Sequence, residues 1–598
     1  MFSNLRPIFP YLRKYRRTFY IGGLCVLCHN AVWILFPMVI RDAVQDLNTH
    51  VTTQTLFKYS LYLLAVAGTK GIFQYLTRWI LIGVSREIEF DLRNDLFAHL
   101  ERLSYSYYQR TRTGDIMARM TNDLNAVRML LGPGIMYTAN TIVFTAVSLV
   151  FMLSISPKLT LFAFLPLPIF SIVVQRFGRQ IHERFERIQA MFSEISARAQ
   201  ENFSGARLIR AYVQEEAEIE LFEGANDEYI GRSLKLVRLM GMLWPTLETL
   251  LGVAIVIVLF VGGREVIQHR INVGDFAAFN TNMVQLTWPI IALGWVINIL
   301  QRGTASLKRI ESILEEKPEV TDAGVNVMDV PVDVRGDIEL CNLSFRYGRT
   351  LQAADDRHGR IHSEEDVLRN VNLRVPAGTS LAIVGPTGSG KSTLVSLIPR
   401  IYDAAPGSVL IDGRPIHEFP LEVLRKNIGF VPQETFLFSD TVRENIAFGS
   451  QNATDADVRR MAEAASIASE IESFPDGYNT VVGERGLTLS GGQKQRTAIA
   501  RALIRNPRIL VLDDALSSVD TQTEDRILNH LREIMHGRTT IFISHRVSTV
   551  RNADRIAVLH DGQIVEYGTH DELIDRNGYY TELYHKQLLE EELETETA

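Results

Sequence analysis

The N-terminal half of the chain contains six stretches that are apolar enough and about long enough to cross a hydrocarbon core of about 30 Å. They lie at residues 18–40, 57–84, 134–155, 158–177, 242–263 and 276–299. The second and the fifth are less uniform, because Lys70, Arg78 and Glu248 interrupt them. The sequence therefore predicts a multidomain protein whose residues 1–305 form an all-α polytopic membrane domain with six transmembrane helices.

The distribution of charge predicts the orientation of these helices. The segment before the first stretch is rich in arginine and lysine, whereas the next loop, about 41–56, offers only Arg41 beside Asp42 and Asp46. By the positive-inside rule the N-terminus is cytoplasmic, and six crossings return the C-terminus to the same side. We therefore expect a multi-pass protein of the cell inner (plasma) membrane, embedded in the lipid bilayer, with both termini in the cytoplasm.

Two inner loops, about 85–133 and 178–241, are long, charged and rich in helix-forming residues. Extending a span by roughly 20 helical residues would carry it about 30 Å into the cytoplasm. Paired spans would then project as hairpins, with tips at about 111–123 and 201–216, where a glycine break meets a short amphipathic run. The pattern alone fits a solvated turn equally well.

Several polar side chains fall within the predicted spans. They are His29, Asn30, Lys70, Arg78, Asn140, Glu248, Gln285 and Asn298. Such groups are costly when they face lipid, so they are expected to face a cavity or one another. For Lys70, Arg78 and Glu248 a substrate pathway and interhelical hydrogen bonding fit equally; for the others the pattern favours hydrogen bonding.

The C-terminal half has the composition of a soluble protein. A linker is expected at 306–336, and apolar strand patterns alternate with amphipathic helices over 337–585, which indicates an α/β domain. Residues 586–598 form an acidic tail. The net charge of −7 over 598 residues argues against a nucleic-acid partner.

The apolar run Leu381–Val384 is followed by GPTGSGKST, which fits the phosphate-binding pattern G-x-x-x-x-G-K-[ST]. Its residues are Gly385, Pro386, Thr387, Gly388, Ser389, Gly390, Lys391, Ser392 and Thr393. Glycines let backbone N–H groups approach a phosphate chain, and the following helix adds its positive end. Lys391 is expected to reach the β- and γ-phosphates and Ser392 to hold Mg²⁺. The motif predicts a P-loop domain that binds a nucleoside triphosphate.

Two further strand patterns end in polar residues. The run 509–514 reads as a buried parallel strand that ends in Asp513 and Asp514, of which Asp513 is placed to hold Mg²⁺. A second run, Thr539–Ser544, is followed by His545. Strand ends of an open parallel sheet are where such sites assemble.

The stretch LSGGQKQR at 489–496 opens another helical pattern. Ser490, Gly491 and Gly492 thus lie at a helix N-terminus, which is a second anion site built from backbone donors. This second site follows the P-loop by about a hundred residues. One nucleotide does not need two separate phosphate-binding sites. A head-to-tail dimer, in which each cradle closes on a different nucleotide, resolves this.

Together these motifs resemble an ATP-binding cassette (ABC) exporter half-transporter of the bacterial multidrug and lipid exporter type, over nearly the whole chain. The resemblance implies an ATPase coupled to transmembrane transport, with ATP and Mg²⁺ as cofactors. It implies that Tyr347 stacks on adenine, that Gln433 senses Mg²⁺ and the attacking water, and that His545 contacts the γ-phosphate. It also implies that Gln493 belongs to the nucleotide-binding LSGGQ element, and that the tips 111–123 and 201–216 are coupling helices.

One departure from the family pattern concerns catalysis. Exporters usually carry Asp-Glu at the end of this strand, with Glu as the general base, whereas this chain carries Asp513-Asp514. The shorter side chain would fall about 1 Å short of the attacking water, and misplacement on that scale costs roughly a hundredfold in rate. In heterodimeric exporters one half carries such an Asp with an intact LSGGQ. The resemblance therefore favours a heterodimer with one degenerate site, and a slowly hydrolysing homodimer is the alternative.

The second departure is the polar segment 348–365, which is longer than the turn expected after Tyr347.

The function that all the motifs indicate is ATP-driven export of an amphipathic or hydrophobic substrate, such as a drug or lipid, by alternating access. An ATP-gated channel or regulatory subunit is the alternative from a different class.

Overall fold

The computed structural model describes residues 7–49, 52–322, 334–347, 366–450, 452–483, 486, 489–515, 537–544, 547–586 and 588. The chain divides into two compact units. The helical unit comprises Met1–Leu96 and Ala118–Ile313, and the sheet unit comprises Phe97–Met117 and Leu314–Ala598. The sheet unit thus includes a short stretch that the chain order places between two membrane helices.

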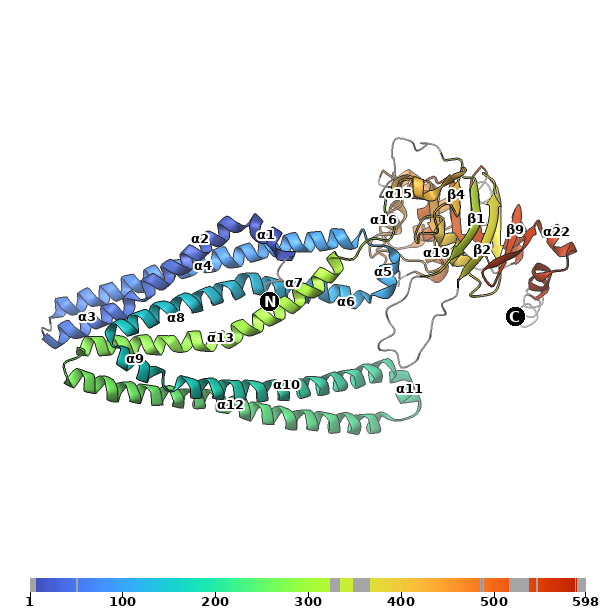
Figure 1. Ribbon diagram of the computed structural model, residues 1–598. Helices are drawn as coiled ribbons and strands as arrows, with labels where there is room; N and C mark the ends of the chain where they lie inside the picture. Colours follow the sequence, from blue (N-terminus) through green and yellow to red (C-terminus); the bar gives the residue numbers. More distant parts are fainter. Residues whose placement is uncertain are drawn as a thin grey trace. The chain divides into compact units, whose positions relative to one another are not determined.

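Long helices build the helical unit (Figure 1). They are α2 (Arg16–Trp33), α3 (Leu35–Thr49), α4 (Thr53–Leu100), α8 (Ile135–Ile155), α10 (Leu167–Ser204), α12 (Glu215–Ile267) and α13 (Val273–Leu314). Shorter ones are α1 (Phe9–Lys14), α6 (Thr113–Ala118), η2 (Arg119–Asp123), α7 (Leu124–Met129), η3 (Leu130–Gly134), α9 (Pro157–Phe164) and α11 (Ala206–Ala211). Helices α10 and α12 lie side by side and are joined through α11. With 53 residues, α12 is roughly 80 Å long at 1.5 Å per residue.

Within the described residues, five helical stretches are long and apolar enough to cross a membrane. They are Arg16–Leu47, Thr113–Ile155, Pro157–Ser204, Glu215–Ile267 and Val273–Leu314. The remaining predicted span, 57–84, lies inside the continuous helix α4 but is not among them. The helical character of this domain is therefore confirmed, whereas the sixth crossing stays a prediction.

Some of the polar side chains of the spans pair between helices. The Asn30 amide donates to Oδ1 of Asn140 at 3.0 Å, which links α2 to α8. The ammonium of Lys70 lies 3.9 Å from the ring centroid of Trp33, which links α4 to α2. Cation–π and amide contacts of this kind satisfy polar groups that would be costly against lipid.

The main sheet of the sheet unit has six strands in the order β10-β9-β3-β8-β7-β6. Their bounds are β3 (Ser380–Val384), β6 (Ile428–Val431), β7 (Ile509–Asp513), β8 (Thr539–Ile543), β9 (Arg555–His560) and β10 (Gln563–Gly568). All neighbouring pairs are parallel except β10 with β9. The carboxyl ends of β3, β8, β7 and β6 therefore meet at one edge, where the predicted motifs follow their strands.

Alternating residues of the buried strands supply two hydrophobic cores, as the period-2 geometry of a strand requires. In β7, Leu510 and Leu512 pack into a core with helices α16 (Val442–Ala447), α17 (Asp455–Ala464) and α19 (Gly491–Leu503). Ile509 and Val511 pack into the other core. Burial on both faces explains why this strand is apolar at every position before its carboxylates.

The second core joins α14 (Lys391–Leu397) to a four-stranded antiparallel sheet in the order β2-β1-β4-β5. These strands are β1 (Ile338–Phe345), β2 (Leu368–Val375), β4 (Val409–Ile411) and β5 (Arg414–Pro415). Further elements are α5 (Tyr105–Arg110), η5 (Ile416–Glu418), α15 (Leu421–Lys426), α18 (Ala468–Ser473), η6 (Gly477–Asn479), α21 (Val547–Val550) and α22 (His570–Asp575). The α/β class expected for the C-terminal half is confirmed.

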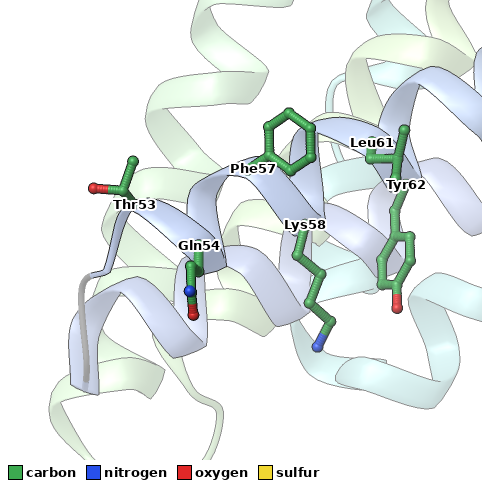
Figure 2. Close-up of a pocket in the computed structure, with 6 residues that line it drawn as sticks. All are labelled: Thr53, Gln54, Phe57, Lys58, Leu61 and Tyr62. Carbon is green, nitrogen blue, oxygen red and sulfur yellow. The ribbon is translucent and has the colours of Figure 1, made fainter.

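A shallow depression lies on the first turns of α4 (Figure 2). It is lined by Thr53, Gln54, Phe57, Lys58, Leu61 and Tyr62. None of the predicted site residues lines it, and its lining comes from a single helix. We therefore assign it no role in the chemistry.

Candidate functional site

The predicted phosphate loop connects β3 to α14. Gly385, Gly388 and Gly390 have φ values of 149°, 86° and 100°, which side chains other than glycine rarely adopt. A Cβ at Gly385 would lie 2.0 Å from the carbonyl oxygen of Leu559. The loop conformation thus requires these glycines, and the helix that follows directs its N-terminal N–H groups toward the loop.

Lys391 is buried in this loop. Its ammonium donates to the carbonyl oxygens of Gly385 at 2.8 Å and Pro386 at 2.9 Å. Burial lowers the pKa of Lys391, while the nearby carboxylates of Asp513 and Asp514 act in the opposite direction. The Lys391 ammonium is buried and donates to neutral carbonyl oxygens. It can exchange these acceptors for a negatively charged phosphate oxygen, with which it forms stronger hydrogen bonds.

The hydroxyl of Ser389, in the same loop, is buried and has no hydrogen-bond partner within the described part of the chain. A buried polar group without a partner is costly. Together with the positive-φ glycines and Lys391, it fits a loop shaped to hold an anion.

Ser392 and Asp513 meet at the start of α14 and the end of β7. The Ser392 hydroxyl donates to Oδ1 of Asp513 at 3.0 Å. Hydroxyl and carboxylate oxygens are the ligands that Mg²⁺ takes beside phosphate oxygens. The two residues predicted to hold Mg²⁺ from distant parts of the sequence therefore lie together, and they fit that ion.

Gln433, the third predicted Mg²⁺ contact, follows β6 two residues after its end and is exposed. Val431 of β6 pairs with Leu512 of β7, so Gln433 lies at the same sheet edge as Asp513. The β6–β7 register thus brings Gln433 to the edge where Ser392 and Asp513 already meet.

Asp514 lies just beyond β7, which ends one residue earlier than the sequence pattern predicted. The reason is a left-handed backbone conformation, with φ of 49°, which Asp and Asn tolerate better than most residues. Its N–H donates to the carbonyl of Ile543 at 3.1 Å, and its carbonyl accepts a long hydrogen bond of 3.5 Å from the amide of Gln495. The backbone is held on both sides, so the length of the side chain sets its reach.

The LSGGQ element caps α19. Ser490 and Gln493 form a capping box, in which the Ser490 hydroxyl accepts from the N–H of Gln493 and the Gln493 amide oxygen accepts from the N–H of Ser490. Gly491 and Gly492 form the first turn. Among the described residues, the hydrogen bonds of Ser490 and Gln493 run within this helix and to Glu470, not to the phosphate loop.

Tyr347 follows β1 and lies beside the phosphate loop. Its hydroxyl is 2.8 Å from that of Thr393, and its ring packs edge-on against Tyr402 with centroids 5.2 Å apart. Burial raises the pKa of Tyr347. The predicted adenine-stacking residue is therefore joined to the last residue of the phosphate motif.

His545 lies outside the described residues, as do the polar segment 348–365 and the acidic tail beyond residue 588. Sequence reasoning missed two residues that contact the site, Gln495 and Tyr402. Gln495 lies only two residues beyond the Gln493 of LSGGQ, on the next turn of α19, which was a usable signal. Nothing in the local pattern around Tyr402 distinguished it from an ordinary core aromatic.

Comparisons with known proteins identify the family of both domains. The family model described as "ABC transporter transmembrane region" matches residues 19–290, and the one described as "ABC transporter" matches residues 368–517. The chain is 37% identical over 98% of both sequences to a Bacillus subtilis protein described as "Probable multidrug resistance ABC transporter ATP-binding/permease protein YheI".

It is also 35% identical to the "ATP-dependent lipid A-core flippase" of Syntrophus aciditrophicus, over 97% of this chain and 94% of the relative. A solved structure of a bacterial Atm1-family ABC exporter with ATP bound matches with a TM-score of 0.76 and 30% identity, covering 96% of this chain and 98% of that one. The chain therefore belongs to the ABC transporters, as an exporter whose membrane domain and transport-coupled ATPase are fused in one polypeptide.

Proposed function

We propose that this chain is one half of a heterodimeric exporter and that its own ATP site hydrolyses slowly. The observation that carries the proposal is Asp514, which occupies the position of the general base at the end of β7. Asp is one methylene shorter than Glu. Because the Asp514 backbone is hydrogen-bonded to Ile543 and Gln495, we do not expect it to move forward to make up this length. A carboxylate about 1 Å from its productive position costs roughly a hundredfold in rate.

The rest of the phosphate site supports tight binding. Lys391 binds the phosphates, Ser392 and Asp513 hold Mg²⁺ with Gln433 near it, and Tyr347 stacks on the base. Mg²⁺ supplies charge neutralisation at the phosphates when bound. His545 contacts the γ-phosphate. This site then acts as an ATP-bound clamp.

The LSGGQ element serves the other site of the dimer. Its capping box is intact, and Gln493 is fixed by the carboxylate of Glu470 at 3.0 Å. The backbone N–H groups of Gly491 and Gly492 lie in the first turn of a 13-residue helix, a position that favours an anion. We infer that they complete the catalytically competent site of the partner half.

The transported substrate is amphipathic or hydrophobic, a proposal supported by relatives described as a probable multidrug resistance ABC transporter and as an ATP-dependent lipid A-core flippase. Both termini lie in the cytoplasm, and the regions 111–123 and 201–216 act as coupling regions. The second contains α11, in which no residue is buried, with Leu208 63% exposed and the adjoining Tyr212 70% exposed. An apolar tip of this kind is suited to dock on another domain.

Two measurements test the proposal. The tagged chain purified from its native membranes should carry a second, different half with Asp-Glu at the corresponding strand end; recovery of this chain alone supports the slow homodimer instead. In vesicles, the complex should accumulate an amphipathic substrate only with ATP. A passive ion current on ATP addition, without accumulation, would indicate a channel.

A further inference from the structure

A cluster of aromatic side chains continues from the phosphate loop into the rest of the sheet unit. Beyond Tyr347, the ring of Tyr402 packs against Phe345 at a centroid distance of 5.9 Å and against Tyr105 of α5 at 5.9 Å. Tyr402 and Phe345 are each only 9% exposed, whereas Tyr105 is 53% exposed. Tyr402 thus lies between the predicted base-stacking residue and α5.

Helix α5 is fixed at several points to the segment that follows α13. The Ser106 hydroxyl donates to Glu319 at 2.6 Å, and Arg110 forms an ion pair with Glu316 at 2.9 Å. The buried Ser104 hydroxyl accepts from the N–H of Val320 at 2.9 Å. Residues that directly follow α4 and α13 in the chain are therefore bound to each other beside Tyr402.

The segment after α13 is in turn tied to the neighbourhood of Tyr402. Arg400, which is buried, donates to the carbonyl of Thr321 at 3.3 Å and pairs with Asp403 at 2.7 Å. The Leu421 N–H donates to Asp322 at 2.9 Å. A displacement of Tyr402 therefore acts on a connected set of contacts rather than on one flexible side chain.

We propose that Tyr402 is a positioning residue that couples nucleotide-base occupancy at Tyr347 to helix α5. This inference rests on the proposed stacking role of Tyr347. The ring of Tyr347 lies edge-on to the rings of Phe345 and Tyr402, at interplanar angles of 86° and 84°, and its hydroxyl lies 2.8 Å from that of Thr393. A base stacked on Tyr347 would therefore act on a ring that is packed against the buried Tyr402, and a shift of one ring in a close-packed cluster moves its neighbour.

Each aromatic contact in this cluster contributes a modest stabilising free energy. Edge-on pairs add about 0.5–1.5 kcal/mol beyond their buried area, which corresponds to about two- to tenfold in an equilibrium constant. Removing the Tyr402 ring should therefore weaken ATP binding by about two- to tenfold. Inorganic tripolyphosphate, which has no base, should bind as before.

The test is hydrogen exchange of the full-length protein, with its second half if one copurifies, followed on peptides covering residues 104–110. Mg-ATP should change exchange in these peptides, and magnesium tripolyphosphate should not. Tyr402→Leu should abolish the ATP response, while Tyr402→Phe, which keeps the ring, should retain it. Tyr580→Leu, which removes another buried tyrosine elsewhere in the sheet unit, is the matched control and should also retain it.

Retention of the ATP response in Tyr402→Leu, no response in the unmodified protein, or an equal response to tripolyphosphate would each overturn the proposal. If Tyr402→Leu does not fold, Tyr105→Ala at the exposed end of the cluster gives the same test, with the response lost and ATP affinity within about twofold. The stacking role is tested separately by Tyr347→Ala. If that variant binds ATP normally, the proposed function of Tyr347 fails, whatever Tyr402 does.

Discussion

The hydroxyl of Ser392 lies 3.0 Å from Oδ1 of Asp513, although 120 residues separate them in the chain. This hydrogen bond joins the first turn of α14 to the end of β7. It places an oxygen ligand pair beside the phosphate loop, which is the arrangement that a magnesium–nucleotide complex requires. The first prediction follows from it.

Ser392→Ala removes one of these oxygens. We expect Mg²⁺-dependent ATP binding to weaken by at least about tenfold, with binding in EDTA little changed. Titration of a fluorescent ATP analogue with and without Mg²⁺ measures this. Ser396→Ala is the control, because its hydroxyl donates only to the carbonyl of Ser392 at 2.7 Å; equal losses in both variants would contradict the assignment.

The lowered pKa of Lys391 predicts that ATP binding is coupled to proton uptake. Burial lowers its pKa below the ordinary value of 10.5, so the nucleotide-free amine loses its proton at a lower pH than a free lysine. A bound phosphate favours the ammonium and raises this pKa again. ATP binding should therefore take up protons between the lowered pKa and 10.5, and its affinity should fall as pH rises through that window.

Calorimetry of ATP binding in two buffers of different ionisation enthalpy measures this proton uptake directly. At alkaline pH the apparent binding enthalpy should differ between the buffers in the direction of uptake. The same enthalpy in both buffers throughout the window would show that Lys391 is charged before ATP binds, and proton release would contradict the predicted uptake.

Alanine substitutions at Gly385 and Gly388 allow a matched comparison of their effects on protein stability. Both have positive φ, but a Cβ at Gly388 meets no atom within 4 Å, whereas one at Gly385 lies 2.0 Å from a backbone oxygen of Leu559. We expect Gly388→Ala to reduce the free energy of unfolding by about 1–2 kcal/mol. Gly385→Ala should cost clearly more, as thermal unfolding without nucleotide would show; equal effects would mean that the loop can shift away from β9.

Glu470 fixes the start of α19. It pairs with the buried Arg496 at 2.5 Å and accepts from Gln493 at 3.0 Å. Glu470→Ala should therefore destabilise the protein by about 1.5–3 kcal/mol, because it leaves a buried guanidinium with fewer partners.

In the assembled exporter, Glu470→Ala should also lower turnover at the partner's site. Glu472→Ala, an exposed carboxylate two residues away, is the control and should change neither quantity. A thermal-shift series combined with the ATPase rate of the complex separates the two effects. Normal turnover in a measurably destabilised Glu470→Ala protein would argue that LSGGQ needs no such support.

The parts of the site that could be predicted are those encoded locally. The phosphate loop needs glycines at fixed positions, and three of them have positive φ. The strand before Asp513 is buried on both faces, so its continuous apolar run identified it. Register in a parallel sheet then brought Gln433 to the same edge.

The parts that could not be predicted depend on contacts between distant segments. The stretch Phe97–Met117 belongs with the sheet unit because α5 binds residues 316–320 and Tyr402, and no local pattern reports such pairing. The left-handed conformation of Asp514 likewise follows from hydrogen bonds to Ile543 and Gln495.

The central claim is that Asp514 makes this site slow. ATP hydrolysis by the purified chain alone, compared with Asp514→Glu and Asp514→Ala, tests it most directly. We predict slow turnover that changes little in Asp514→Ala, and an increase of about ten- to a hundredfold in Asp514→Glu, because the added methylene restores the reach of the carboxylate. Brisk turnover by the unmodified chain that Asp514→Ala abolishes would contradict the account.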